Sequence, residues 1–517
     1  MFNQFKNEMK MRKSLTYAFV LLAMAIPFVS CDNSNNNDPT PEPTVERTWG
    51  TDGGLKSVND ILFGTNRDTI GNGDSELVFK GSQTIKKGTY YLKGWIYIAD
   101  GSTLTIEPGT VIRGDKKTMA TLIAESGGKL IAQGTASSPI VFTSAQPAGS
   151  RKPGDWGGII ICGKAPNNQN NDQQIEGGPR THHGGSDASD NSGILSYVRI
   201  EFAGYPFQKD KEINGLTLGS VGSGTQIDHV QVSYSNDDSF EWFGGTVNCN
   251  HIVAYSGWDD DFDTDNGFSG NVQFGLSIRN PRIADQSQSN GFESDNDAGG
   301  DLIEPYTKAV FSNITFIGPM GRDGFENTTD YITGGSFNPN NGSALGKYQT
   351  AMHIRRASRL SCFNSVVVGW PIGIIIDGEK GDSQTSATKG LINIQNVWFA
   401  ALGITGSDAN KSYVDELITS WKSPITYDKT KKSFSSTWLL AQPNVKVSDS
   451  ASSWNLTDGI NAGVPFRPQA GSPLLDAASF TSSLLSSFTK VSYIGAFSAN
   501  DTWLDGWTNF DPENTNY

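Results

Sequence analysis

Short runs of β-branched and aromatic residues follow one another from about residue 84 and are separated by Gly, Asn and Asp. Several of these runs are apolar on both faces, which is typical of parallel strands buried between other layers. Helical periodicity is almost absent, with residues 414–421 as the best candidate, and a series of Asn-Gly hairpin turns is missing. The pattern predicts an all-β chain, with a right-handed parallel β-helix over residues 51–405 and final coils and a cap over residues 406–517.

A four-residue motif repeats within the predicted β-helix. It consists of an acidic or amide residue, a variable residue, phenylalanine and a carboxylate, and its copies begin at Asp238, Asp260, Asn290 and Asp323. The spacings of 22, 30 and 33 residues suit one coil of a solenoid, in which equivalent positions stack. We therefore expect an internal ladder of phenylalanines and an external ladder of carboxylates. Stacked like charges repel, so cations or hydrogen-bond donors should lie beside them.

The negative charge of the chain is concentrated in one region. The whole sequence has 54 acidic and 40 basic residues, a net charge of −14. Residues 212–304 alone contain 16 Asp and Glu but only two basic residues, Arg279 and Arg282. This distribution predicts a local acidic site in place of a diffuse solubilising surface. It also argues against nucleic acid as a partner, because phosphates require a basic surface.

The densest acidic segment, residues 259–267, predicts a Ca²⁺ site. Hard cations of this kind take about six to eight oxygen ligands. The alternate spacing of Asp261, Asp263 and Asp265 resembles the first half of a calcium loop, but position six is Asn266 and position twelve is Val272. A second acidic group follows over residues 295–301, and a purely structural ion or a solvated turn is the alternative. The expected metal ligands are Asp259, Asp260, Asp261, Asp263, Asp265, Asp295 and Asp297.

Other side chains near these segments are candidates for ligand contact. Arg355 and Arg356 could clamp a carboxylate or a phosphate, or could equally pair with the acidic ladder. Trp side chains beside polar clusters could stack on sugar rings, although core packing is their commoner use. The loop pair His182-His183 could bind a transition metal, but a solvated pair is more common. The predicted ligand-binding residues are Asp237, Asp238, Glu241, Trp242, Trp258, Glu293, Glu326, Arg355 and Arg356.

The N-terminal segment has the pattern of a secretory signal peptide over residues 1–30. Basic residues precede an apolar run over residues 15–29, which is too short to span a membrane. Cys31 follows this run in a segment that resembles a bacterial lipobox, with Phe28 in place of the usual Leu. We expect a lipidated Cys31 and a flexible tether over residues 31–50, with an ordinary secreted protein as the alternative. The other cysteines, Cys162, Cys249 and Cys362, lie in or near apolar runs and are expected to be buried thiols.

Longer segments of the chain form a recognisable set. They are Thr-Leu-Thr-Ile-Glu-Pro-Gly-Thr-Val-Ile at 103–112 and residues 127–132, 138–144, 154–159, 175–178, 237–243, 257–265, 290–296 and 493–497. Together these segments resemble a family of outer-membrane or secreted lipoproteins from Bacteroidetes-type bacteria. The resemblance implies a pectin-lyase-like right-handed parallel β-helix at the cell envelope. It implies no definite activity, because that of the family is not well established.

Three functions fit these features. The first is a surface lipoprotein that binds a ligand, or an envelope partner such as an outer-membrane transporter, without catalysis through its acidic face. The second is a calcium-dependent polysaccharide lyase or a glycosidase acting on acidic glycans, in which Arg355 or Lys308 would be the base of a lyase. The third is a structural or adhesive surface protein. The first is favoured, because neither basic residue adjoins the acidic segment in sequence.

Overall fold

The computed structural model describes residues 56–57, 68–73, 76–208, 211–285, 287–322, 325, 347–408, 417–420 and 425–517. The expected signal peptide, the tether with Cys31, and the candidate ligand-binding residue Glu326 lie outside the described residues. Within the described part of the chain, no helix is both long enough and apolar enough to span a lipid bilayer.

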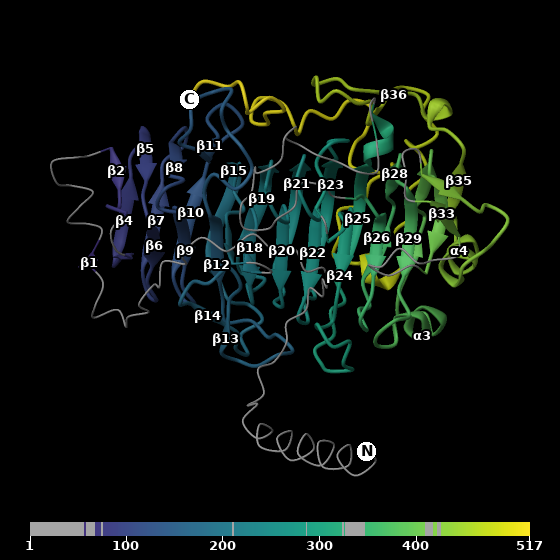
Figure 1. The fold of residues 1–517 in the computed structure, drawn as a ribbon, viewed down its shortest axis with the longest axis horizontal. Helices are drawn as coiled ribbons and strands as arrows, with labels where there is room; N and C mark the ends of the chain where they lie inside the picture. Colours follow the sequence, from purple (N-terminus) through teal and green to yellow (C-terminus); the bar gives the residue numbers. More distant parts are fainter. Residues whose placement is uncertain are drawn as a thin grey trace, which may run out of the picture. The chain divides into compact units, whose positions relative to one another are not determined.

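Parallel strands form the ribbons of a right-handed β-helix (Figure 1). The first ribbon is a 12-stranded parallel sheet in which each strand pairs with its equivalent in the neighbouring coil. Its strands are β1 (Lys56–Ser57), β3 (Leu77–Phe79), β6 (Trp95–Ile98), β9 (Thr121–Ala124), β12 (Gly158–Cys162), β18 (Leu216–Gly219), β20 (Phe240–Phe243), β22 (Phe262–Asp265), β24 (Phe292–Ser294), β26 (Thr350–Ile354), β29 (Ile372–Ile376) and β32 (Ile404–Ser407).

The second and third ribbons are joined as a 17-stranded sheet, because five long strands belong to both. The long strands are β15 (Gly193–Glu201), β19 (Gln226–Ser233), β21 (Asn248–Tyr255), β23 (Asn271–Ile278) and β25 (Val310–Ile317). The second ribbon adds β4 (Ser82–Ile85), β7 (Thr103–Ile106), β10 (Lys129–Gln133), β27 (Ser361–Phe363) and β30 (Ile394–Gln395). The third adds β2 (Thr69–Ile70), β5 (Thr89–Leu92), β8 (Val111–Gly114), β11 (Ile140–Ser144), β28 (Val366–Val368), β31 (Trp398–Ala400) and β35 (Lys446–Ser448).

One bend position separates the second ribbon from the third in consecutive coils. The residue at this position has left-handed backbone dihedrals and is skipped by the strand register on both sides. Asn adopts this conformation more readily than most residues do, and three coils use it. We call this set the bend ladder, and it comprises Tyr197, His229, His251, Phe274, Asn313, Asn364 and Asn396.

The phenylalanine ladder is confirmed for three of the four motif copies. Phe240 is in register with Phe262, and Phe262 with Phe292, and all three rings are fully buried in the central core. The next coil places Met352 opposite Phe292. The prediction for the fourth copy is therefore wrong: Phe325 lies outside the ladder and contacts Tyr348 at a ring-centroid distance of 6.0 Å.

Helices are few among the described residues. The prediction of a helix at residues 414–421 is wrong for residues 418–420. These residues form the strand β33 (Ile418–Ser420), which pairs with β34 (Thr426–Tyr427). The longest helix of the described residues is instead α4 (Phe434–Leu440), which packs against β29 and β32 and places Leu439 in the central core. Its buried face also includes Ser435 and Ser436. The helix has only 7 residues, too few for a recognisable apolar periodicity, so the hydrophobic pattern missed it.

The C-terminal segment, residues 450–517, runs back along the β-helix as the yellow trace in Figure 1. The bend-ladder amides hold it: Asn396 Nδ2 donates to Ala477 O (2.6 Å), and Asn313 Nδ2 donates to Tyr493 O (2.9 Å). Further along, Tyr517 Oη donates to Glu201 Oε1 at 2.6 Å. Apolar residues of the segment and of the outer side of the third ribbon form a second buried cluster. The segment therefore covers one side of the coils along much of their length.

The remaining elements are short. Two-stranded antiparallel pairs are formed by β13 (Gln173–Gln174) with β14 (His182–His183), β16 (Pro206–Gln208) with β17 (Lys211–Glu212), and β36 (Leu456–Thr457) with β37 (Arg467–Pro468). The helix α3 (Ser383–Thr388) and the 3₁₀ turns Pro319–Gly321, Ser452–Trp454 and Ser483–Leu485 complete the described fold. The three cysteines 162, 249 and 362 are buried free thiols, as the sequence predicts, and burial raises their pKa values.

Candidate functional site

The outer side of the first ribbon carries the predicted carboxylate ladder. Side chains alternate along a strand, so the core phenylalanines of β20, β22 and β24 turn their neighbours outward. Glu241, Asp263 and Glu293 are in register on these strands, and His353 on β26 follows them. Glu241 is nevertheless buried, and Asp263 and Glu293 are partly buried. The external ladder is confirmed for three coils, but its charges are largely removed from water.

The first position of the motif links neighbouring coils through the backbone. Asp238 Oδ1 accepts a hydrogen bond from the backbone N–H of Asp260 at 2.8 Å. Asp260 Oδ1 accepts from the N–H of Asn290, and Asn290 Oδ1 accepts from the N–H of Thr350 at 3.2 Å. Each side chain thus satisfies a donor at the start of the following coil, which explains why only Asp and Asn occur at these positions.

Carboxylates from adjacent coils converge into three overlapping groups. Within each group, one oxygen from each residue lies within 4.8 Å of the others. The groups are Asp237–Asp238–Asp259, Asp238–Glu241–Asp263 and Asp260–Asp263–Glu293. Because Asp238 and Asp263 are each shared by two groups, the seven residues form one continuous set. We call this set the acidic row: Asp237, Asp238, Glu241, Asp259, Asp260, Asp263 and Glu293.

The acidic row is an electrostatically unfavourable arrangement unless protons or cations neutralise it. Burial raises the pKa values of Asp238, Glu241, Asp260 and Asp263, and neighbouring carboxylates raise them further. Within the described residues, none of the row makes an ion pair except Glu293. Closely spaced carboxylate oxygens are the ligands that Ca²⁺ prefers. The arrangement therefore fits a hard divalent cation.

Among the described residues, basic side chains form ion pairs with the row at one end only. Arg355 Nη2 lies 2.6 Å from Glu293 Oε1, and His353 Nδ1 lies 3.1 Å from Glu293 Oε2. Arg355 and Arg356 also pair with Asp295, at 2.8 Å and 2.9 Å. Of the two alternatives left open for these arginines, the structure shows pairing with the acidic ladder. His353, which the sequence reasoning did not select, is held between Glu293 and Asp377.

The other expected metal ligands, Asp261, Asp265, Asp295 and Asp297, belong to none of the three carboxylate groups. Asp261 forms a fully buried ion pair with Arg279. Asp265 Oδ1 accepts from the N–H of Asn266, and Asp297 Oδ1 accepts from the N–H of Asp301. The resemblance to a calcium loop fails for a simple reason: residues 262–265 are a β-strand. Its alternate residues project from one side and do not wrap around a single ion.

Two candidate ligand-binding tryptophans are corrected to core residues. The Trp242 side chain is fully buried in the central core, where its ring stacks on Phe268 at a centroid distance of 5.3 Å. Trp258 is buried in the cluster beneath the C-terminal segment. Strand alternation accounts for Trp242, because it follows the outward Glu241. Neither ring is available to stack on a sugar. His183 is likewise buried and bonded to Ser220 Oγ.

In the absence of divalent cations, the free energy of unfolding is expected to fall as the pH rises from 3.8 to about 7. Burial and the charge of Asp285 raise the pKa of Asp259 from its ordinary value of 3.8 to about 7. A carboxyl with a higher pKa in the folded state stabilises the fold below its unfolded pKa, and this contribution is lost as the pH rises through the folded pKa. Melting temperatures measured across this window in a chelator test the expectation, and a rising melting temperature would contradict it. Saturating Ca²⁺ should abolish the decline.

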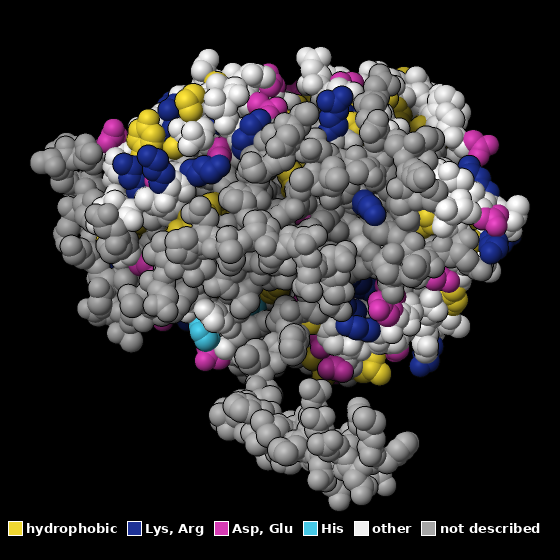
Figure 2. Space-filling view, viewed as in Figure 1, with side chains coloured by type: hydrophobic (Ala, Val, Ile, Leu, Met, Phe, Trp, Pro, Cys, Tyr) yellow, Lys and Arg dark blue, Asp and Glu magenta, His cyan; other side chains and the backbone are white. Residues whose placement is uncertain are grey.

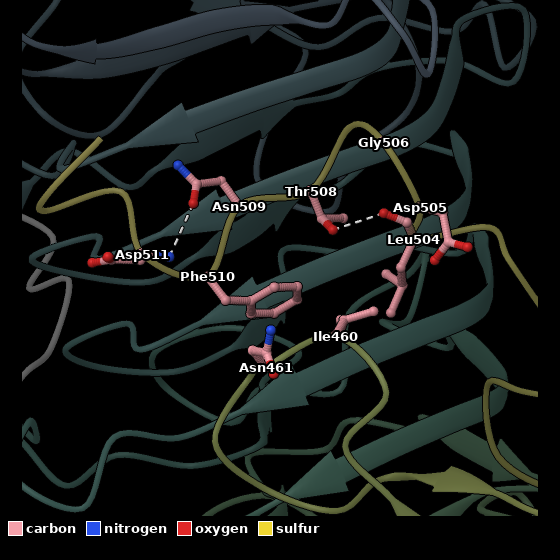
Figure 3. Close-up of a pocket in the computed structure, with 9 residues that line it drawn as sticks. All are labelled: Ile460, Asn461, Leu504, Asp505, Gly506, Thr508, Asn509, Phe510 and Asp511. Carbon is pink, nitrogen blue, oxygen red and sulfur yellow. Dashed lines mark hydrogen bonds between the residues drawn. The ribbon is translucent and has the colours of Figure 1, made fainter. Parts of the chain in front are cut away.

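The surface offers a separate pocket of about 430 Å³ in the C-terminal segment (Figure 3). It is lined by Ile460, Asn461, Leu504, Asp505, Gly506, Thr508, Asn509, Phe510 and Asp511. None of these residues belongs to the acidic row. On the face drawn in Figure 2, the described Asp and Glu side chains are scattered among basic and polar ones.

Comparison with known proteins supports the same architecture. The sequence profile of a family described as a pectate-lyase-like β-helix domain matches residues 78–439. Comparison with curated proteins and with solved structures finds no match. The matched segment covers more than half of the chain and contains every residue of the acidic row. The chain belongs to the family of pectate-lyase-like β-helix domains.

Proposed function

We propose that this protein is a lipid-anchored lipoprotein of the outer membrane, displayed at the cell surface, that binds a ligand or partner through a calcium-loaded acidic row without catalysing a reaction. The observation that carries the proposal is the set of six closely spaced carboxylates that make no ion pair within the described residues. A bound Ca²⁺ would offset their repulsion and could bridge to an acidic glycan or to a carboxylate of a partner.

Calcium binding is expected to depend on Asp263, because this residue belongs to two of the three carboxylate groups. Replacing Asp263 with Asn removes a charged ligand and should weaken Ca²⁺ affinity at least about ten-fold. At a free Ca²⁺ concentration of about 100 times the dissociation constant, the wild type gains about 2.7 kcal/mol of stability. Isothermal titration calorimetry and thermal melting with and without chelator measure both effects.

The matched control is Asp187→Asn, which removes an exposed carboxylate outside the row. This variant should bind Ca²⁺ as the wild type does. Equal affinity in the Asp263 and Asp187 variants, or no binding to the wild type, would refute a calcium site in the acidic row. A chelator that leaves the melting temperature unchanged would also count against the structural or adhesive alternative, in which calcium stiffens the coils.

A second candidate function is a calcium-dependent polysaccharide lyase, and one contact favours it. Arg355 lies 2.6 Å from Glu293, so a basic side chain does adjoin the carboxylates of the row. Such an enzyme needs a base to remove the proton beside a uronate carboxyl group. Arg355 is poorly suited to this role, because its guanidinium is buried and paired with both Glu293 and Asp295. Binding is therefore the better supported function.

Assays of the purified protein on a panel of uronate polymers separate the two functions. Release of unsaturated or reducing ends that requires Ca²⁺ and disappears in Arg355→Lys would establish the lyase. Release of reducing ends without unsaturation would instead indicate the glycosidase. If neither product forms, proteins that co-purify with the native lipoprotein from solubilised envelopes should include its partner, for which an outer-membrane transporter is the leading candidate.

A further inference from the structure

Two histidines occupy neighbouring places in the bend ladder, far along the coil from the acidic row. His229 lies on β19 and His251 on β21, and their rings stack with centroids 4.4 Å apart. Tyr197 stacks on the outer face of His229 at 4.3 Å, and Phe274 stacks on His251 at 4.9 Å. The result is a column of four rings, of which only the middle two carry nitrogen atoms.

Both imidazoles turn the same nitrogen towards one carboxylate. His229 Nδ1 lies 2.9 Å from Asp228 Oδ1, and His251 Nδ1 lies 2.8 Å from the same oxygen. The contact from His251 is a hydrogen bond, whereas the buried Nδ1 of His229 lacks hydrogen-bond alignment despite its short distance. One ligand atom from each of the three residues lies within 4.8 Å of the others. Two imidazole nitrogens thus face the same carboxylate oxygen, and only that of His251 is aligned for a hydrogen bond with it.

Ring stacking alone does not account for this choice of residues. Other coils fill the same ladder position with Tyr, Phe or Asn, and each of these maintains the bend without a ligand nitrogen. Among these residue types, only histidine has a side-chain nitrogen that can coordinate a metal ion beside the carboxylate. Two imidazoles and one carboxylate form a ligand set that suits zinc and other first-row divalent ions better than Ca²⁺. Side-chain exposures of 12% for His229, 25% for His251 and 32% for Asp228 leave the group reachable from solvent.

We propose that Asp228, His229 and His251 bind one divalent transition-metal ion of the zinc type, independently of the acidic row. The ion would join two adjacent coils directly beneath the C-terminal segment, where Trp503 and Trp507 contact the imidazole rings at 5.2 Å and 5.6 Å. Three protein ligands leave at least one coordination position for water or for an exogenous ligand.

Titration of the chelator-treated full chain with Co²⁺ tests this site, because cobalt reports its ligands through visible absorption. One Co²⁺ should bind per chain, and Zn²⁺ should displace it. Replacing His251 with Asn should weaken binding at least about ten-fold, since loss of a direct ligand exceeds the loss of an outer-shell contact. The ladder tolerates Asn, as Asn313 shows. His251→Phe gives a second test that keeps the ring column, because Phe274 occupies the next position.

Two controls separate this site from other histidines and from the calcium site. His182→Asn alters an exposed imidazole that lies 3.0 Å from Asp172, and it should leave Co²⁺ binding unchanged. Asp263→Asn should also leave it unchanged, whatever its effect on Ca²⁺. The proposal is overturned if the wild type binds no Co²⁺ or Zn²⁺. It is equally overturned if folded Asp228→Asn and His251→Phe variants bind these ions as tightly as the wild type.

Discussion

Replacement of Arg279 with Met is expected to lower the free energy of unfolding by about 3–5 kcal/mol at neutral pH, the cost typical of breaking a buried ion pair. Arg279 Nη1 lies 2.8 Å from Asp261 Oδ1, and neither side chain has any exposure to solvent. Arg279 Nη2 also donates to the carbonyl oxygen of Trp258 at 3.1 Å. The variant leaves the Asp261 carboxylate buried without its counter-charge, which is the source of the large penalty.

The loss of stability caused by removing Arg279 should depend on pH, whereas the loss caused by removing the Asp261 charge should not. Burial already raises the pKa of Asp261, and removing Arg279 takes away the charge that opposes this shift. In Arg279→Met, the carboxyl can take up a proton, so the penalty should shrink as the pH falls towards 4. In Asp261→Asn, the guanidinium cannot lose its proton, so the penalty should persist. Guanidinium chloride unfolding, followed by tryptophan fluorescence at several pH values, measures both.

Arg282 provides the matched control for this pair. It is exposed and lies three residues beyond Arg279, so Arg282→Met should change the free energy of unfolding by less than about 0.5 kcal/mol. The double variant Arg279→Met with Asp261→Leu should be more stable than the single variants Arg279→Met and Asp261→Asn, because neither charge of this pair remains buried. Equal effects of Arg279→Met and Arg282→Met would show that the buried ion pair does not stabilise the fold as expected.

Replacement of Phe262 with Ala is expected to lower the free energy of unfolding by about 3–5 kcal/mol, as found for buried aromatic residues. Phe262 is the middle ring of the internal ladder and is fully buried. It contacts Phe240 at a centroid distance of 5.8 Å and Phe311 at 6.0 Å. Removing the ring leaves a cavity between three coils that the surrounding strands cannot close. Chemical unfolding, checked by thermal melting, measures the change.

The sequence motif supplies its own control at Phe325. This residue has the same motif context but is only partly buried and lies outside the ladder. Phe325→Ala should therefore cost much less than Phe262→Ala, whereas motif membership alone would predict equal costs. Phe262→Leu, which retains most of the volume, should cost less than about 1.5 kcal/mol. Comparable losses for Phe262→Ala and Phe325→Ala would contradict the ladder assignment.

The strands and the core ladder were predictable because their signals are local. Runs that are apolar on both faces appear in any single coil, and spacings of 22 and 30 residues gave the correct register of Phe240, Phe262 and Phe292. The fourth copy failed because the next coil is longer: Phe292 pairs with Met352, 60 residues on, and Phe325 falls within the intervening segment. A spacing rule cannot detect a coil that is longer than its neighbours.

The sequence predicted that the candidate cation site consists of carboxylates, but it did not predict which carboxylates come together. Asp260 and Asp263 do meet Glu293 across coils, and Asp237 and Asp238 meet Asp259. Asp261, however, is taken by Arg279, which lies 18 residues later in the chain. Asp295 is taken by Arg355 and Arg356, some 60 residues later. Which carboxylates keep their charge unpaired depends on these distant arginines, and no local pattern encodes the pairing.

By itself the sequence determined that this chain forms a parallel β-helix with an acidic, aromatic-cored middle region, because strand hydrophobicity and charge density are properties of short segments. Only the tertiary structure decided which side chains share a site. It stacked His229 on His251 at one bend, buried Trp242 behind Glu241, and brought the C-terminal segment back across the coils. The reason is that each coil's length sets the register of the next, so contacts between coils depend on every residue between them.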